Sequence, residues 1–100
     1  MRGRVWQRGD IVSLSFASTL GHEQQGRRAA MVLTQAAFNK LGMIGVCPIT
    51  HGGQSMRDAG MAVSLTGAGL QTGGVVLIHQ FRMIDPKPRG LKLIEYAPHY

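Results

Sequence analysis

Glycine is the residue that most constrains how this chain can fold. Fourteen glycines are spread over 100 residues, and they divide the apolar residues into short runs. Glycine inside a helix costs about 1 kcal/mol relative to alanine, so a chain interrupted this often favours short strands and turns. The longest apolar stretches, such as residues 75–78, are far shorter than the roughly 18 residues of a membrane-spanning helix. The sequence therefore predicts one β-rich domain over residues 1–100, with no membrane segment.

Five apolar runs have the spacing of β-strands. Residues 12–16 and 61–65 alternate apolar with small side chains, which is typical of a strand with one buried face. Residues 29–33, 43–49 and 75–78 are continuously apolar and predict strands that are covered on both faces. Short strands joined by glycine-rich turns favour a small barrel or sandwich, because closure of a sheet removes its exposed edges.

One short helix is predicted over residues 35–40. Thr34 is a candidate N-cap, and Gly42 lies where a left-handed C-terminal cap is expected. A longer helix over residues 29–41 is the alternative, since its apolar residues also recur at helical spacing. It ranks second, because residues 31–33 continue a strand-like run.

The charge balance restricts the function. Eleven Lys and Arg residues face only five acids, for a net charge of +6, which favours a polyanionic partner such as nucleic acid or an acidic protein. So few carboxylates argue against a two-metal nuclease or a paired-carboxylate glycosidase. The single cysteine, Cys47, excludes an intramolecular disulfide and fits a reducing cytoplasm. We therefore expect no metal site and no cofactor.

Polar side chains concentrate in three segments beside the predicted strands, at residues 21–28, 50–57 and 79–82. They contain histidines, which can act as base or acid near neutral pH, arginines, which bind phosphate through paired N–H groups, and a threonine hydroxyl. A ribonuclease that works without a metal needs these groups. Non-functional roles stay open at this point: Arg27 and Arg28 could be solvated loop charges, and His79 could be a hydrogen-bonded core residue.

The order of these motifs resembles the MazF and PemK/Kid toxins of toxin–antitoxin modules. The motifs are Gly21-His22-Glu23-Gln24-Gln25-Gly26 with Arg28, then Pro48-Ile49-Thr50, then Gly74-Val75-Val76, within residues 8–96. The resemblance implies a mainly β fold, the small SH3-like β-barrel of MazF, Kid and CcdB, with one or two short helices. It also implies a two-fold symmetric homodimer. Family members usually continue into a C-terminal helix, which we expect to be short or missing here.

The resemblance implies a function as well. Such toxins are endoribonucleases, or mRNA interferases, that cut single-stranded mRNA at short sequence motifs without a metal or the ribosome. They leave 2′,3′-cyclic phosphate and 5′-hydroxyl ends and inhibit translation and growth. The implied partners are single-stranded RNA, a cognate antitoxin with an acidic disordered tail, and operator DNA only through the antitoxin complex. The implied location is the cytoplasm.

Site residues follow from the same resemblance. Arg28 would stabilise charge on the phosphate, and Thr50 would hold a phosphate oxygen. His22 and Glu23 correspond to positions at or beside the catalytic centre. The expected RNA-binding residues are Gln24, Gln25, Arg27, His51, Ser55, Arg57, Gln80 and Arg82.

Two positions depart from the pattern of the Kid branch. An arginine and an aspartate that are assigned acid and base roles there are Leu77 and His79 in this chain. The acid assignment therefore does not carry over, while His79 becomes a candidate base beside Arg28, Thr50, His22 and Glu23. A protein of the toxin fold that binds RNA, DNA or an antitoxin without cleavage is the alternative.

Overall fold

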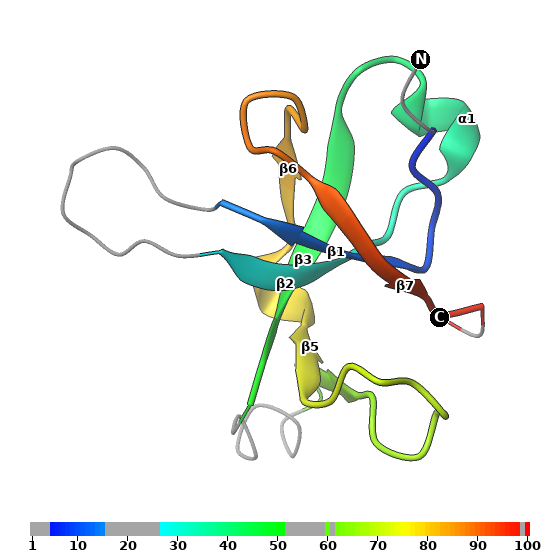
Figure 1. Ribbon diagram of the computed structural model, residues 1–100, viewed down its shortest axis with the longest axis vertical. Coiled ribbons are helices and arrows are strands. Elements are labelled where there is room, and N and C mark those ends of the chain that lie inside the picture. The colour runs from blue at the N-terminus through cyan, green and yellow to red at the C-terminus, as the bar shows by residue number, and fades with distance from the viewer. Residues whose placement is uncertain (1–4, 16–26, 52–59, 61, 99) are drawn as a thin grey trace, which may run out of the picture.

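The computed structural model describes residues 5–15, 27–51, 60, 62–98 and 100. Strands dominate this part of the chain, and the helical elements are short (Figure 1). The strands are β1 (Asp10–Leu14), β2 (Arg28–Val32), β3 (Ile44–Thr50), β4 (Ala62–Ser64), β5 (Val75–Leu77), β6 (Arg82–Ile84) and β7 (Lys92–Tyr96). The helical elements are α1 (Ala36–Asn39) and the 3₁₀ helix η1 (Ile78–Gln80).

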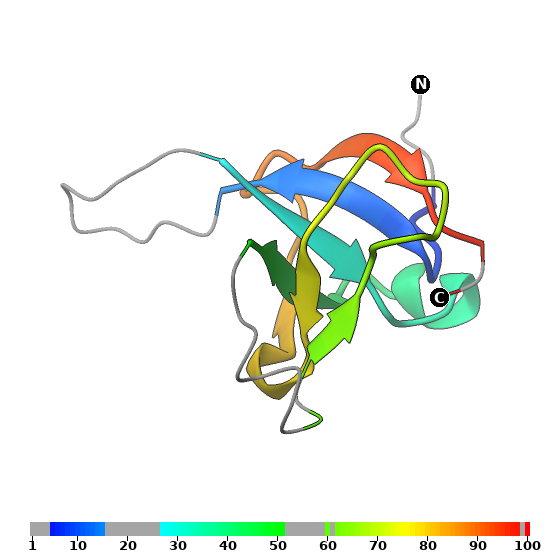
Figure 2. The same ribbon diagram turned by 90° about the horizontal axis from the view of Figure 1, so that it is seen from below.

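All strand pairs are antiparallel, in the order β4-β5-β3-β2-β1-β7, and β6 pairs with β3 outside this path. Figure 2 shows β1 and β7 on one side of a strongly curved sheet and β4 and β5 on the other. This barrel-like arrangement confirms the prediction of a small, mainly β fold.

The central strand is β3, which is buried from Ile44 to Ile49. One edge of β3 pairs with β2, and the other edge pairs first with β6 and then with β5. Because β3 has neighbours on both edges and apolar cover on both faces, its sequence is a continuous apolar run rather than an alternating one. This strand therefore fixes where the shorter strands lie.

Two apolar clusters cover opposite faces of the sheet. The first contains Ile11, Met31, Cys47, Ile49, Leu65, Val76 and Ala97. The second contains Val12, Leu14, Ala30, Val32, Ile44, Val46 and Ile84. Neighbouring residues of β1, β2 and β3 alternate between the two clusters, as side chains of a strand must. We call the face of the second cluster the front face of the sheet and the face of the first the back face.

The predicted strands are confirmed in the part of the chain that the structure describes, with shifted ends. Phe16 and Met61, at the ends of the two alternating runs, lie outside the described residues. β6 and β7 were not predicted. The alternative helix over residues 29–41 is wrong, because Arg28–Val32 forms β2.

The predicted helix exists but is shorter, and Gln35 rather than Thr34 is its N-cap residue. Thr34 Oγ1 instead donates to Asn39 Oδ1 at 2.5 Å and accepts from the Gly45 backbone N–H at 2.9 Å. Asn39 Nδ2 donates to the carbonyls of Trp6 at 2.7 Å and of Thr34 at 2.8 Å. This network joins the N-terminal segment, α1 and β3. Lys40 is the C-cap residue of α1, so Gly42 lies beyond the predicted cap position. Gly42 has the expected positive φ, 111°, and its N–H donates to the Asn39 carbonyl at 3.1 Å.

Candidate active site

A small cavity lies on the front face of the sheet beside β3. It has a volume of about 170 Å³ and is lined by Arg28, Pro48, Gln80 and Arg82. Three of these residues belong to the predicted RNA-binding and catalytic set. They come from three separate elements, β2, η1 and β6. The fold therefore brings together polar side chains that are distant in the sequence.

Strand register explains how the two arginines reach one cavity. Arg82 is paired with Val46 of β3, so it shares the front face with Val46 and Pro48. On the other edge of β3 the ladder with β2 ends at the pair of Ala30 and Pro48, and Arg28 lies two residues beyond Ala30 on the same face. Beyond this pair the strands separate (Figure 1). Two guanidinium groups thus approach Pro48 from opposite edges of β3.

Pro48 lies where strand pairing on one edge of β3 is interrupted. The Gly45 carbonyl accepts from the Leu33 N–H at 2.9 Å, so Gly45 directs its polar backbone groups toward β2, and by alternation Pro48 faces the other edge. On that edge the pairing with β6 ends at Val46 and the pairing with β5 begins at Ile49. The missing N–H of proline therefore falls in a gap of the ladder, where it costs no strand hydrogen bond. The η1 turn passes this gap and brings Gln80 to the cavity.

Thr50 and His51 lie at the end of β3, outside the lining of this cavity. Thr50 is half-buried, and its hydroxyl donates to the His51 carbonyl at 3.2 Å. A Cβ on Gly74 would lie 2.5 Å from the Thr50 carbonyl oxygen and 3.5 Å from His51 Nδ1. The backbone of Gly74, which directly precedes β5 and has a φ of 103°, therefore packs tightly against the Thr50 carbonyl and lies close to His51.

His79 is exposed on η1, so the interpretation as a core histidine is wrong. Its Nε2 lies 3.4 Å from Gln80 Nε2, and Gln80 lines the cavity. Leu77, at the position of the Kid-branch arginine, is buried with Ala62 and Val75 in a small apolar cluster. The Leu77 side chain thus contributes to packing, and His79 is the titratable group next to the cavity-lining amide.

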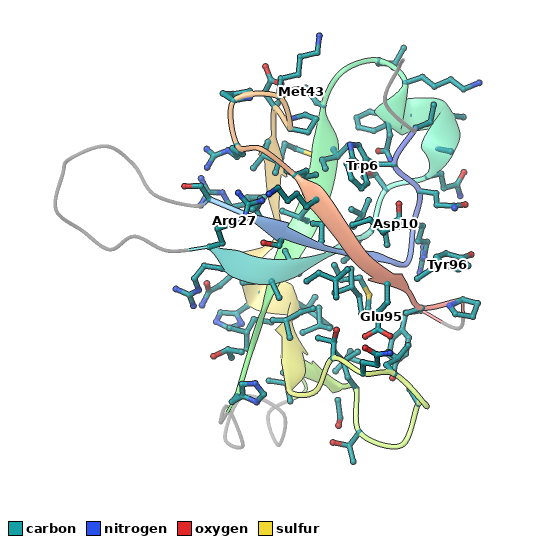
Figure 3. All side chains as sticks on the ribbon, viewed as in Figure 1. Trp6, Asp10, Arg27, Met43, Glu95 and Tyr96 are labelled. Atoms are coloured by element: carbon teal, nitrogen blue, oxygen red, sulfur yellow. The ribbon has the colours of Figure 1, made fainter. Side chains whose placement is uncertain are left out.

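Arg27 lies on the opposite face of β2 from Arg28. Its Nε donates to Ser13 Oγ at 2.7 Å, and its Nη2 donates to the carbonyls of Ser13, at 2.7 Å, and Gly90 (Figure 3). The side chain therefore links β2 to β1 and to the segment before β7. The RNA-binding role expected for Arg27 stays a prediction.

Several predicted site residues lie outside the described part of the chain: His22, Glu23, Gln24, Gln25, Ser55 and Arg57. Within the described part, no group of three His, Cys, Asp or Glu side chains is placed to hold a metal ion. In the same residues, no helix is long and apolar enough to cross a membrane. Burial raises the pKa of the Cys47 thiol to about 11, so this buried group stays protonated near neutral pH.

Two of the acids in the described part of the chain, Asp10 and Asp85, have structural contacts in turns. Asp10 is buried at the start of β1 and accepts from the Gln7 N–H at 3.0 Å. Asp85 Oδ1 accepts from the Lys87 N–H at 3.1 Å in the turn after β6. The Asp85 contact confirms the interpretation of Asp85 as a turn residue. Asp10 is instead the first residue of β1, and its carboxylate closes the turn that precedes this strand.

Glu95 makes a structural contact that sequence analysis missed. Its carboxylate accepts from Thr72 Oγ1 at 2.5 Å and from the N–H groups of Thr72, at 2.6 Å, and Gln71, at 3.0 Å (Figure 3). The Thr72 hydroxyl first, and then the Gln71 N–H, hold the pKa of this carboxyl below its ordinary value. The contact fastens β7 to the segment that leads to Gly74, and hence to the backbone that packs against Thr50. No local sequence motif indicates that Glu95 pairs with residues 71 and 72.

Comparison with known proteins identifies the family of this chain. The model of the PemK-like, MazF-like toxin of type II toxin–antitoxin systems matches residues 7–100. Endoribonuclease PemK of Escherichia coli is 48% identical over 93 residues, covering 92% of this chain and 70% of that protein. Endoribonuclease toxin ChpB of Escherichia coli (strain K12) is also 48% identical over 93 residues, covering 92% of this chain and 80% of that protein.

Solved structures give the same result. A MazE–MazF structure from Deinococcus radiodurans (Form-II) superposes with a TM-score of 0.83 at 35% identity, covering 97% of this chain and 85% of that chain. MazF (Form-I) from Deinococcus radiodurans has a TM-score of 0.78 at 36% identity, covering 97% of this chain and 86% of that chain. The resemblance noted from the motifs is confirmed. The chain belongs to the PemK-like, MazF-like toxin family of type II toxin–antitoxin systems.

Proposed function

We propose that this chain is an endoribonuclease toxin that cuts single-stranded mRNA at short sequence motifs, without a metal and without the ribosome. The observation that carries the proposal is the cavity in which Arg28 and Arg82 converge with Gln80 over Pro48. Two relatives at 48% identity are named as endoribonucleases, which supports the same activity. Cleavage of mRNA would inhibit translation and growth.

The reaction is transfer of the phosphate to the neighbouring 2′-oxygen. The 2′-oxygen forms a bond to phosphorus as the bond from phosphorus to the 5′-oxygen breaks. A base takes the proton of the 2′-hydroxyl, and an acid gives a proton to the 5′-oxygen. The products are a 2′,3′-cyclic phosphate and a 5′-hydroxyl end. Negative charge grows on the phosphate oxygens in the transition state, and it is this charge that the two guanidinium groups stabilise.

The other side chains have supporting roles in this proposal. His79 lies next to Gln80 on η1 and is the described candidate for the base, since imidazole exchanges protons near neutral pH. Thr50 donates to a phosphate oxygen when its hydroxyl turns from the His51 carbonyl. His22 and Glu23 complete the proposed catalytic set. Gln24, Gln25, Arg27, His51, Ser55 and Arg57 bind the flanking nucleotides.

The partners follow from charge and from the relatives. A chain of net charge +6 attracts both RNA and the acidic disordered tail of an antitoxin. The structural neighbours include MazE–MazF structures, which supports an antitoxin as partner. We further propose that the toxin acts as a homodimer in the cytoplasm and that it contacts operator DNA only through the antitoxin complex.

The experiment is cleavage of a long single-stranded RNA in the presence of EDTA, with the ends of the products mapped. We expect defined cuts with 2′,3′-cyclic phosphate ends. Arg28→Ala should lower kcat by about 100- to 1,000-fold, the cost of removing one donor to a developing oxyanion. Lys40→Ala is the matched control, because it removes one positive charge at the end of α1, away from the cavity.

Three results contradict the proposal. Intact RNA at high enzyme concentration, even if RNA binds, favours a toxin-fold protein that binds without cleavage. Cutting that requires added metal contradicts the proposed chemistry. Full activity in Arg28→Ala shows that the cavity is not the active site.

A further inference from the structure

Gly45, the second residue of β3, leaves a notch in the surface of the sheet. A Cβ on this residue would lie 2.5 Å from Cζ and 2.6 Å from Cε1 of Phe81, distances at which atoms overlap. The Phe81 ring therefore occupies the space that a side chain at position 45 would fill. Glycine weakens a strand interior, and one reason to find it there is the close approach of another group. Here that group is an aromatic ring.

The wall of the notch is rigid. Thr34 Cγ2 would lie 2.9 Å from the same Cβ, so the threonine methyl group borders the ring. The Thr34 hydroxyl is held between the Gly45 N–H and the Asn39 side chain, and Asn39 is buried and fully hydrogen-bonded. A satisfied buried network of this kind fixes the position of its members.

Phe81 stands in the chain between two residues that line the cavity, Gln80 and Arg82. Gly45 is paired with Met83, and Val46 is paired with Arg82, so the notch opens on the back face while Arg82 points to the front face. The Phe81 N–H also donates to the Ile78 carbonyl at 3.1 Å, which closes the η1 turn. A ring seated in the notch therefore holds the backbone from the side opposite the cavity.

Phe81 contributes little to the core. Its side chain is 46% exposed, and it is not a member of the described clusters of buried residues. A half-exposed ring that needs a glycine beneath it is poorly explained by burial of apolar area. A role in holding the backbone between η1 and β6 explains these contacts better.

We propose that Phe81 and Gly45 are a positioning pair for the active site. The ring in the glycine notch fixes the backbone at the junction of η1 and β6. The side chains of Gln80 and Arg82 therefore stay oriented toward the cavity that Arg28 also lines. This inference rests on the proposed function for its kinetic consequence, while the geometric consequence can be measured without catalysis. A displacement of about 1 Å in such groups can cost about 100-fold in rate.

The test is a double-mutant cycle. Phe81→Ala removes the ring, and Gly45→Ala expels it, so each should lower kcat/KM for RNA by about 10- to 100-fold. The double variant should be no worse than Phe81→Ala alone, because the added methyl group meets no ring. Met83→Ala is the matched control: it removes a 40% exposed apolar side chain from β6, the strand that directly follows Phe81 and pairs with β3. It should change kcat/KM by less than about twofold.

A second readout separates positioning from general stability. All variants are compared at a temperature where thermal unfolding shows each to be folded, and NMR signals of the Gln80 side-chain amide and the Arg82 Nε–H are recorded. We expect these signals to move in Phe81→Ala and Gly45→Ala and to stay in place in Met83→Ala.

The outcomes are distinct. Unchanged kcat/KM in Phe81→Ala, or NMR signals that do not move, overturns the positioning role. If the unmodified protein does not cut RNA at all, the proposed function fails, and the NMR comparison alone decides the role of the pair. Additive losses in the double variant would show that the two residues act separately.

Discussion

The network around Asn39 permits a quantitative prediction of stability. Asn39 is 8% exposed, and its side chain makes three hydrogen bonds, to the Trp6 carbonyl, the Thr34 carbonyl and the Thr34 hydroxyl. Asn39→Ala removes all three and leaves two carbonyls short of a donor. At about 1 kcal/mol for each hydrogen bond, the free energy of unfolding should fall by about 3 kcal/mol. A domain of this size changes its Tm by about 4–8 °C per kcal/mol, so Tm should fall by about 12–24 °C.

The assay is urea unfolding followed by tryptophan fluorescence, since Trp6 lies beside α1 (Figure 3). Gln35→Ala is the control, because Gln35 is exposed next to the same helix and makes no side-chain cap hydrogen bond. Thr34→Val removes the hydroxyl shared by Asn39 and the Gly45 N–H and should cost about 2 kcal/mol. The double variant should cost less than the sum, since both changes remove the same contact.

A loss below about 1 kcal/mol in Asn39→Ala would refute the reasoning, because water would then satisfy the freed carbonyls as well as the amide does. Strict additivity with Thr34→Val would refute the network itself. Either result would also contradict the rigidity that we ascribe to the wall of the notch beneath Phe81.

Three further predictions follow from single contacts. The pKa of Glu95 is lowered in the folded chain, so its contribution to stability is present above the ordinary value of 4.5 and is lost as pH falls through the folded pKa. The free energy of unfolding of Glu95→Gln should therefore depend less on pH in this acid range than that of the unmodified protein, as urea titrations at stepped pH would show. Gly74→Ala should lower Tm more than Gly67→Ala, because both have positive φ but only the Cβ at position 74 meets the Thr50 carbonyl; equal losses would show that φ strain alone matters. The buried Cys47 thiol, with its pKa raised to about 11, should react with a thiol reagent only after unfolding; rapid labelling of the native protein would contradict this.

Prediction from the sequence worked where the local pattern decides the structure. β2 and β3 were predicted because each is a continuous apolar run bounded by polar or glycine-containing segments. β6 and β7 were missed, because their exposed residues, such as Met83 and Leu93, give no periodic signal. These two strands form because β3 and β1 offer unpaired edges. Thr34 was expected to cap α1, but the tertiary contacts with Asn39 and Gly45 take its hydroxyl.

The sequence by itself determined the mainly β class, the excess of positive charge and the motif that includes Arg28, since these depend only on residue type and order. Only the tertiary structure decided that Arg28 meets Arg82 and Gln80. That meeting depends on the register of β2 and β6 against β3, which alternation alone does not specify. Alternation along the strand places Arg27 on the face opposite Arg28, but only the tertiary structure decided that Arg27 binds Ser13 there, because this contact depends on the pairing of β1 with β2.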